Sequence, residues 1–555
     1  MVLNKFIHKL SIVRLLTIFM NRILLVLYKY RINRQTTGVK DKGKDKIIFW
    51  MAGGMPGLYS IEIPYLVALK ARGYDVDAVI CDGTYIACVK REVTDNIDVS
   101  DWSRTCFDCH SNCGKTLGNL GIEYKSIGDY FSSSELEDFR VRSKNLSWGQ
   151  LDAFYYKGIN LGQSIHESVS RFYQGENNYI DPEVLDEYSF SAIVAFETAE
   201  KILDKNNYFA FFSSHGVYVD WGAPLLAAIK RKLISTIWFS SHLLGHYFFV
   251  HAYLKDGRVG IERNIKNIDL RKLENDTSVS YDVKLDDFLY ARYNSSLADD
   301  VIPSCVSHNQ NDLIDRLSFD NKNPIWCIFL HINWDAVASH DAMLFSSFDE
   351  WTIKTIEKIC NISGVNWLLK IHPHETTYYG FGETVQLINN EFPLLPDNVK
   401  IIPPDTNLST QNIFSLINGG VTVYGTSGLE LAALGKPVIL AGNPYYANDS
   451  YTLNPKTRDE YFMLLESAGN IKPLSDNAKK TARQFAYLHF LGSQIKHPLI
   501  HAYRRSDGEL TWDLMLDKLS LLKPGADSDI ELVVDGIVNG SPYFYQYLLN
   551  GDKSW

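Results

Sequence analysis

The sequence predicts an α/β protein with two successive Rossmann-like domains. Near the start, a strand pattern at 47–52, a helical periodicity at 61–72 and a second strand pattern at 76–81 form a complete βαβ unit, which implies a parallel sheet. A fresh alternation of strand and helix patterns begins at Pro324. The most informative stretch, residues 421–440, runs in the order strand, tight polar turn, short helix, glycine and second strand.

The bulk composition is that of a large globular protein. A chain of 555 residues is too long for one ordinary core, so two or more domains are expected. The hydrophobic content of 46% and the charged content of 22% are ordinary, and a net charge of −10 gives no general case for nucleic acid as a partner. Eight cysteines are too few for a disulfide scaffold, which favours a reducing compartment.

The N-terminal segment is basic. Residues 1–46 hold eleven Lys/Arg and two Asp/Glu, a net charge of +9 that leaves −19 on the remainder. Residues 6–28 are apolar but are interrupted by Lys9, Arg14 and Arg22, whereas a spanning helix needs about 20 nearly uninterrupted apolar residues. No small-residue cleavage site follows, which argues against a signal peptide. We expect an amphipathic helix in the membrane interface, followed by a polar linker; the alternative is a helix packed on the protein itself.

The first domain continues with a second αβ series. Helical patterns cover 135–144, 158–173 and 181–205, and strand patterns cover 209–213 and 234–240.

The turn at 214–222, between a strand pattern and the helix expected at 223–231, contains His215 and Asp220. These two residues are the best candidates in the first domain for a general base that removes a proton from a hydroxyl. Glu62 and Asp82 are weaker candidates.

The second domain follows a charged, less regular region at 255–320, which we expect to contain the domain boundary. Its expected strands are 324–332, 365–371, 399–402, 421–423 and 437–441, and its expected helices are 350–362, 411–417 and 429–434.

The turn Gly425, Thr426, Ser427 and Gly428 precedes one of these helices. Free N–H groups and the helix dipole favour an anion at such a position, and glycines let a phosphate approach the backbone. The plainer interpretation of Ser427 alone is an ordinary N-cap.

Lys370 and His372 flank the end of another strand pattern. With the hydroxyls of the later turn, they could neutralise a phosphate leaving group without a metal, and two such strand ends describe a nucleotide-phosphate crevice. His372 alone could be a structural turn residue. Glu430 could bind a ribose or sugar hydroxyl, or be a helix-dipole carboxylate. Glu375 could likewise bind a hydroxyl, or be a solvated turn charge.

A cysteine cluster provides a weak candidate for a structural metal site. Cys106, Cys109, His110 and Cys113 have short metal-ligand spacing, but no second CxxC pair completes a zinc ribbon. Reduced, packed cysteines are the simpler interpretation.

Several of these motifs resemble a known family. Residues 370–375 (KIHPHE), 424–430 (YGTSGLE) and 434–439 (LGKPVI) resemble the C-terminal half of bacterial capsule and surface-polysaccharide biosynthesis proteins, which are GT-B glycosyltransferase-like. Asn333 and Asp335, in the sequence Asn-Trp-Asp, add to the similarity and would lie at the cleft. The resemblance covers most of residues 46–470.

The resemblance implies a GT-B-like fold with an interdomain cleft. It also implies that His372 and Ser427 contact the phosphate of the donor, as a similar pair does in sialyl-, Kdo- and polyol-phosphate transferases, while Gly425, Thr426 and Gly428 shape the turn. A GT-B enzyme normally needs no catalytic metal and no cofactor beyond its nucleotide-sugar substrate. The paired-acidic turn of some sialyltransferase families has no match here.

The expected domains are a basic membrane-associating helix with its linker at 1–45, an acceptor domain at 46–310, a donor domain at 311–480 and a helical tail at 481–555 that could pack back on the first domain. The leading hypothesis is a glycosyltransferase that moves a sugar from a nucleotide-sugar to a capsule, O-antigen or other surface polysaccharide. Its acceptor would be lipid-linked or a polysaccharide, and the enzyme would be cytoplasmic, peripheral on the inner face of the cytoplasmic membrane.

Two other classes of function fit the same motifs. A nucleotide-sugar 2-epimerase or a polyol-phosphate transferase would share the architecture. A non-catalytic scaffold of polysaccharide assembly or export would tolerate the loss of Ser427 or His372.

Overall fold

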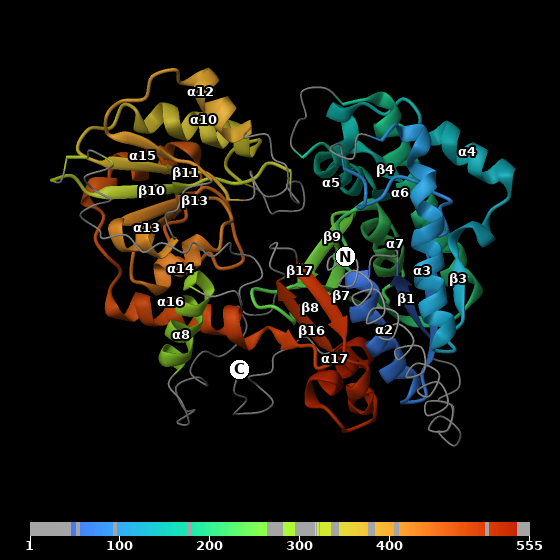
Figure 1. Ribbon diagram of the computed structural model, residues 1–555. Coiled ribbons are helices and arrows are strands. Elements are labelled where there is room, and N and C mark those ends of the chain that lie inside the picture. Colours follow the sequence, from blue (N-terminus) through green and yellow to red (C-terminus); the bar gives the residue numbers. More distant parts are fainter. Residues whose placement is uncertain are drawn as a thin grey trace, which may run out of the picture.

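The computed structural model describes residues 46–51, 56–92, 97–174, 180–262, 281–294, 322–334, 343–373, 383–404, 410–504 and 510–540, with single positions at 317, 319, 320 and 375. The chain forms two α/β lobes, each built on its own sheet (Figure 1).

The first sheet has the strand order β15-β8-β7-β6-β1-β2-β3, with β9 paired to β8. The five strands from β3 to β7 in this order run parallel, and β8, β9 and β15 are antiparallel additions at one side. Their bounds are β1 Lys46–Met51, β2 Asp75–Ile80, β3 Tyr124–Ser126, β6 Tyr208–Ser214, β7 Ile234–Ser240, β8 His246–Lys255, β9 Arg258–Glu262 and β15 Ile495–Lys496.

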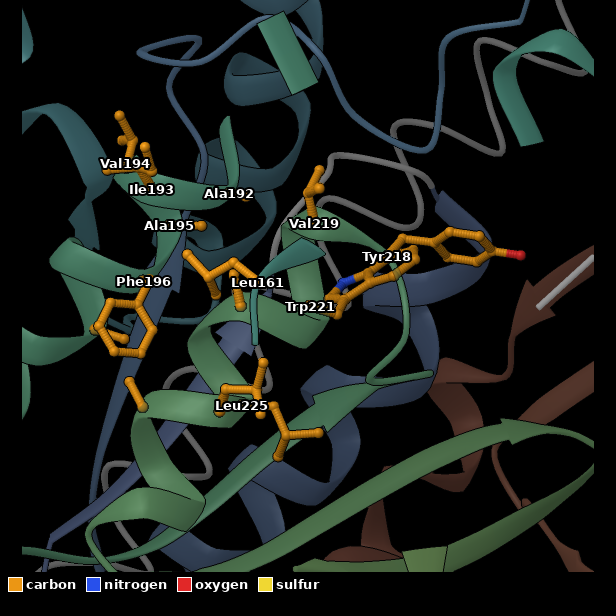
Figure 2. Close-up of a cluster of buried hydrophobic side chains, with 14 of the residues drawn as sticks. Leu161, Ala192, Ile193, Val194, Ala195, Phe196, Tyr218, Val219, Trp221 and Leu225 are labelled. Atoms are coloured by element: carbon orange, nitrogen blue, oxygen red, sulfur yellow. The ribbon is translucent and has the colours of Figure 1, made fainter. Parts of the chain in front are cut away.

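Helices cover both faces of this sheet. Because side chains alternate along a strand, Ile48 and Trp50 of β1 join the core on one face, while Ile47 and Phe49 join the core on the other. The first face carries α5 (Gly162–Tyr173), α6 (Pro182–Lys205) and α7 (Val219–Lys230), and part of its core is drawn in Figure 2. The second face carries α2 (Pro56–Lys70), α3 (Cys106–Asn119) and α17 (Ser528–Asn539). A further helix, α4 (Ser133–Ser143), packs against α6, and a small hairpin pairs β4 (Tyr155–Tyr156) with β5 (Ile159–Asn160).

The second sheet is parallel throughout, with the order β12-β11-β10-β13-β14. Its strands are β10 Ile325–Phe329, β11 Asn366–Lys370, β12 Val399–Ile402, β13 Gly419–Thr422 and β14 Val438–Leu440. The core on one face includes residues of α8 (Tyr281–Asn294), α13 (Thr410–Leu416), α14 (Ser427–Ala433) and α16 (Asp476–Tyr487). The core on the other face includes residues of α10 (Phe348–Ile359), α12 (Glu383–Glu391) and α15 (Arg458–Glu466).

After the second sheet the chain returns to the first lobe. A π-helical turn at Leu488–Gly492 follows α16, and β15 then pairs with β8. The hairpin β16 (Ile500–Arg504) and β17 (Leu510–Leu514) and the helix α17 lie beside α2 (Figure 1). The boundary that the sequence places at residue 480 therefore falls within α16.

The prediction of an α/β protein with two Rossmann-like domains is confirmed, although the first sheet carries antiparallel strands beside its five parallel ones. One local prediction is wrong: α7 begins at Val219 rather than at residue 223, so Asp220 lies in a helix and not in the turn with His215. The N-terminal amphipathic helix lies outside the described residues. None of the helices that the structure describes is long and apolar enough to cross a membrane.

Candidate functional site

The strand order of the second sheet reverses between β10 and β13, because the chain first builds β10, β11 and β12 outward and then adds β13 on the other side of β10. In open parallel sheets, ligands bind outside the carboxyl ends of the strands at such a switch point. The residues that follow β10 and β13 are therefore the first place to look for a ligand site.

Residues 424–427, hereafter the 424–427 turn, follow β13 and are partly exposed between buried neighbours. Thr422 Oγ1 accepts the N–H of Gly425 (3.3 Å), and the buried Tyr446 donates its hydroxyl to Gly425 O (2.6 Å). Among the described residues, Ser427 Oγ has no hydrogen-bond partner. The hydrogen bonds of Thr422 and Tyr446 thus fix the turn at Gly425. The Ser427 hydroxyl, which has no partner among the described residues, lies at the switch point.

The structure revises how the helix begins. Thr426, not Ser427, is the N-cap of α14, and its side chain makes no capping hydrogen bond. Since α14 has only seven residues, the helix dipole invoked from the sequence is weak, and the argument for a phosphate rests on the switch point instead.

Arg292 of α8 lies behind this turn and was missed by sequence reasoning, because it falls in the irregular region 255–320. Its guanidinium approaches Thr426 Oγ1 and Glu430 Oε1, each at 3.5 Å, and both charged side chains are buried. Burial raises the pKa of Glu430, and Arg292 opposes that shift. Glu430 is therefore buried beside a cation of the protein itself, the guanidinium of Arg292.

β11 ends at Lys370, and His372 and Glu375 follow it. Lys370 points inward, near Cys327, where burial lowers the pKa of its ammonium group. His372 is partly exposed, and its carbonyl accepts the N–H of Glu375 (3.2 Å). Glu375 is buried, and burial raises the pKa of its carboxyl, with Asp349 adding to the effect. Of the three residues, only His372 combines strand-end position with exposure.

His372 and Ser427 do not follow neighbouring strands. β10 lies between β11 and β13, so the two strands are two spacings, about 10 Å, apart. The end of β10 fills the middle of the site, where Asn333 donates to Asp349 Oδ1 (3.1 Å). Asp335, the second predicted cleft residue, lies outside the described residues.

His331 occupies this central position and was also missed, because the strand was expected to run to residue 332 and therefore to include it. The strand ends at Phe329, and the imidazole of His331 stacks on Phe348 (ring centroids 4.8 Å apart, planes at 14°). A polar residue that ends an apolar strand was the available signal.

The first sheet has a corresponding switch point between β1 and β6, and His215 follows β6. Its ring stacks on Trp221 (5.2 Å, 21°) and contacts Trp238 (6.0 Å), while Nδ1 is hydrogen-bonded to Ser214 Oγ. The φ angle of +40° is rare for a residue with a side chain. Such a local strain, combined with partial exposure, is a common mark of a functional residue.

The environment of Asp220 differs from that of His215. It is almost fully buried, accepts the N–H of Val89 at Oδ2 (3.3 Å), and lines a small pocket with thiols that include Cys81 and Cys88. Oδ1 has no hydrogen-bond partner among the described residues. Burial raises the pKa of Asp220 to about 6, against the opposing effects of the Val89 N–H and of Arg171.

We expect Asp220→Asn to stabilise the protein above pH 6 and not below pH 4. The folded-state pKa of about 6 exceeds the ordinary 3.8, so the wild type loses stability as the pH rises through this interval. The full difference is up to about 3 kcal/mol. Apparent melting temperatures of both proteins at pH 4 and pH 7.5 test this; a difference independent of pH would contradict it.

The two weaker base candidates, Glu62 and Asp82, both accept hydrogen bonds from other residues of the first lobe. Burial raises the pKa of Glu62 to about 8, against the hydrogen bond that Trp238 Nε1 donates (3.2 Å), so burial favours the protonated form of this carboxyl. Asp82 accepts the N–H groups of Thr84 (3.1 Å) and Gly128 (3.0 Å) and organises a turn.

Arg171 connects the two switch points. This α5 residue places its guanidinium 5.5 Å from the ring of Tyr218, which precedes α7, and 6.0 Å from the ring of Trp334, which follows β10. It also pairs with Glu92 at 3.9 Å. A cation between the two lobes was not predicted, because nothing in the helical pattern of 158–173 distinguishes it from a surface charge.

The cysteine cluster lies on α3. Cys113 is buried in the core, whereas Cys106 and Cys109 line the pocket of Asp220. Within the described ranges, no group of three His, Cys, Asp or Glu side chains is arranged to hold a metal ion, so the metal interpretation has no support there.

No protein-family model and no curated protein sequence matches the chain. Similar solved structures include the β-Kdo 2,4-transferase KpsC of Thermosulfurimonas dismutans (14% identity, 57% of this chain and 87% of the other, TM-score 0.30). They also include a UDP-GlcNAc 2-epimerase of Neisseria meningitidis bound to UDP-GlcNAc (9% identity, 80% and 97%, TM-score 0.23) and a glycosyltransferase of Rickettsia africae (12% identity, 81% and 94%, TM-score 0.25). At these identities and TM-scores, the description of the fold rests on the strand order of the chain itself.

Proposed function

We propose that the chain is a metal-independent glycosyltransferase that moves a sugar from a nucleotide-sugar to a capsule, O-antigen or other surface polysaccharide. The donor binds at the switch point of the second sheet, and a lipid-linked or polysaccharide acceptor enters from the first lobe. Residues 1–45 attach the enzyme to the inner face of the cytoplasmic membrane.

The observation that carries this proposal is the partly exposed 424–427 turn at a switch point, with a Ser427 hydroxyl that has no partner among the described residues and with His372 on the other side of β10. The span of about 10 Å between the strands suits a phosphate together with the sugar attached to it better than a single small anion. Both residues donate hydrogen bonds that suit phosphate oxygens.

The first lobe supplies the proposed chemistry. His215 removes the proton of the acceptor hydroxyl, whose oxygen attacks the anomeric carbon of the donor; the bond from that carbon to the phosphate oxygen breaks, and the nucleotide leaves with the electron pair. The remaining residues that we propose to form the donor-binding site are Lys370, Glu375, Gly425, Thr426, Gly428 and Glu430. Asp220 remains the second candidate for the base.

A panel of CMP, CDP, UDP, GDP and UMP tests donor binding by thermal shift on the full chain. We expect one nucleotide to stabilise the protein, by about 2.7 kcal/mol at a hundred times its dissociation constant. His372→Ala should weaken that nucleotide at least tenfold because a phosphate donor is lost, whereas His501→Ala, an exposed histidine in β16, should not.

The outcomes separate the classes of function. No shift with any nucleotide in a folded sample would contradict the transferase and favour a scaffold. Binding followed by conversion of the nucleotide-sugar to its 2-epimer, without an acceptor, would favour the epimerase.

A further inference from the structure

His331 lies at the centre of the site, and its hydrogen bonds define its chemical state. Nε2 is 3.2 Å from the backbone nitrogen of Val423 and 3.2 Å from that of Tyr424. Backbone N–H groups can only donate, so Nε2 must be the acceptor and carries no hydrogen. The imidazole is therefore neutral, with its proton on Nδ1.

The same nitrogen lies 3.1 Å from Thr422 Oγ1, which in turn accepts the N–H of Gly425 (3.3 Å). One imidazole thus holds Thr422, Val423 and Tyr424 directly and Gly425 through Thr422, at the point where β13 passes into the 424–427 turn. The parallel stacking of the ring on Phe348 of α10 keeps Nε2 aimed at these groups.

We propose that His331 is the positioning residue of the donor site, whose neutral imidazole holds the 424–427 turn in its ligand-binding form and releases it when Nε2 is protonated. The inference deepens the proposed function and rests on it for the identity of the ligand, but not for the state of the turn. A proton on Nε2 would face the N–H groups of Val423 and Tyr424, so both hydrogen bonds would be lost together.

The titratable groups around this ring come from several elements. α10 contributes Asp349, which is bonded to Asn333, and burial raises the pKa of its carboxyl. Glu375 after β11 interacts with Asp349, and the phenol ring of Tyr424 lies 6.4 Å from the ring of His331. Asp349→Asn is therefore the control for a pH effect that arises beside His331 rather than on it.

The test compares His331→Phe with His331→Gln. Phenylalanine keeps a flat ring against Phe348 but has no acceptor, whereas the glutamine carbonyl accepts hydrogen bonds and does not titrate in this range. Hydrogen–deuterium exchange of the peptide covering residues 421–427, without any ligand, should be at least tenfold faster in His331→Phe than in the wild type. His331→Gln should stay within about threefold of the wild type at pH 7.5.

Between pH 7.5 and pH 5, the wild type should lose this protection relative to His331→Gln measured at the same pH, and Asp349→Asn should follow the wild type. The nucleotide identified by thermal shift should bind His331→Phe at least tenfold more weakly. Unchanged exchange in His331→Phe, or the same pH profile in wild type and His331→Gln, would overturn the proposal. If no nucleotide binds any variant while the exchange results hold, the proposed function fails and the positioning role stands.

Discussion

Replacement of His215 by asparagine is expected to lower the rate of sugar transfer by a factor of about 10² to 10⁴, the usual contribution of a general base. Asparagine is chosen because the backbone at this position has a φ of +40°, which asparagine tolerates better than most residues. The fold and the binding of the nucleotide should be retained, because the nucleotide is expected on the other sheet.

The measurement is kcat and KM for the donor that the nucleotide panel identifies. Ser214→Ala should lower kcat by a smaller factor, about tenfold, because it removes the hydrogen bond that orients Nδ1 but leaves the imidazole in place. His110→Asn in α3 is the matched control and should leave kcat unchanged. Activity within twofold of the wild type in His215→Asn would remove His215 from the mechanism and leave Asp220 as the base candidate.

Replacement of Gly428 by alanine is expected to destabilise the second lobe by about 1 to 3 kcal/mol and to weaken nucleotide binding at least tenfold. A Cβ atom at this position would lie 2.3 Å from Oη and 3.0 Å from Cζ of Tyr446. That ring is fully buried, and its hydroxyl donates to Gly425 O, so moving the ring disturbs the turn itself.

Urea unfolding and nucleotide titration measure the two effects. Gly118→Ala in α3 is the matched control, because a Cβ there meets nothing within 4 Å, and it should be neutral or stabilising by up to about 1 kcal/mol. Tyr446→Phe removes the clashing oxygen, so Gly428→Ala should cost less in that background than in the wild type. An equal cost in both backgrounds would show that the hydroxyl of Tyr446 is not the cause.

Most elements could be predicted from the sequence because their patterns are local. The strand pattern at 234–240 coincides with β7, and the one at 399–402 coincides with β12. The start of α7 was misplaced because four residues of the expected turn, 219–222, belong to the helix. A helix start depends on the N-cap position that the fold provides, here Tyr218, as much as on residue preference.

The candidate site was only partly predictable. The 424–427 turn and His372 stand at strand ends that periodicity alone reveals. Arg292, His331 and Arg171 could not be found in this way, since their contacts are with distant parts of the chain. Arg292 and Arg171 act on residues more than a hundred positions away, and His331 on residues 92 and 93 positions away. Lys370 shows the converse: it ends a strand, but the pleat turns its ammonium group into the core.

The sequence by itself determined the fold class, the two successive α/β series and the glycine-containing turn after β13, because helical and strand periodicity and glycine positions act over a few neighbouring residues. Only the tertiary structure decided that β10 separates the two predicted phosphate ligands, that His331 holds the turn between them, and that Asp220 is buried away from His215. The reason is physical: which strand ends become neighbours and which charges are buried depend on how distant segments pack, and the linear pattern does not contain that order.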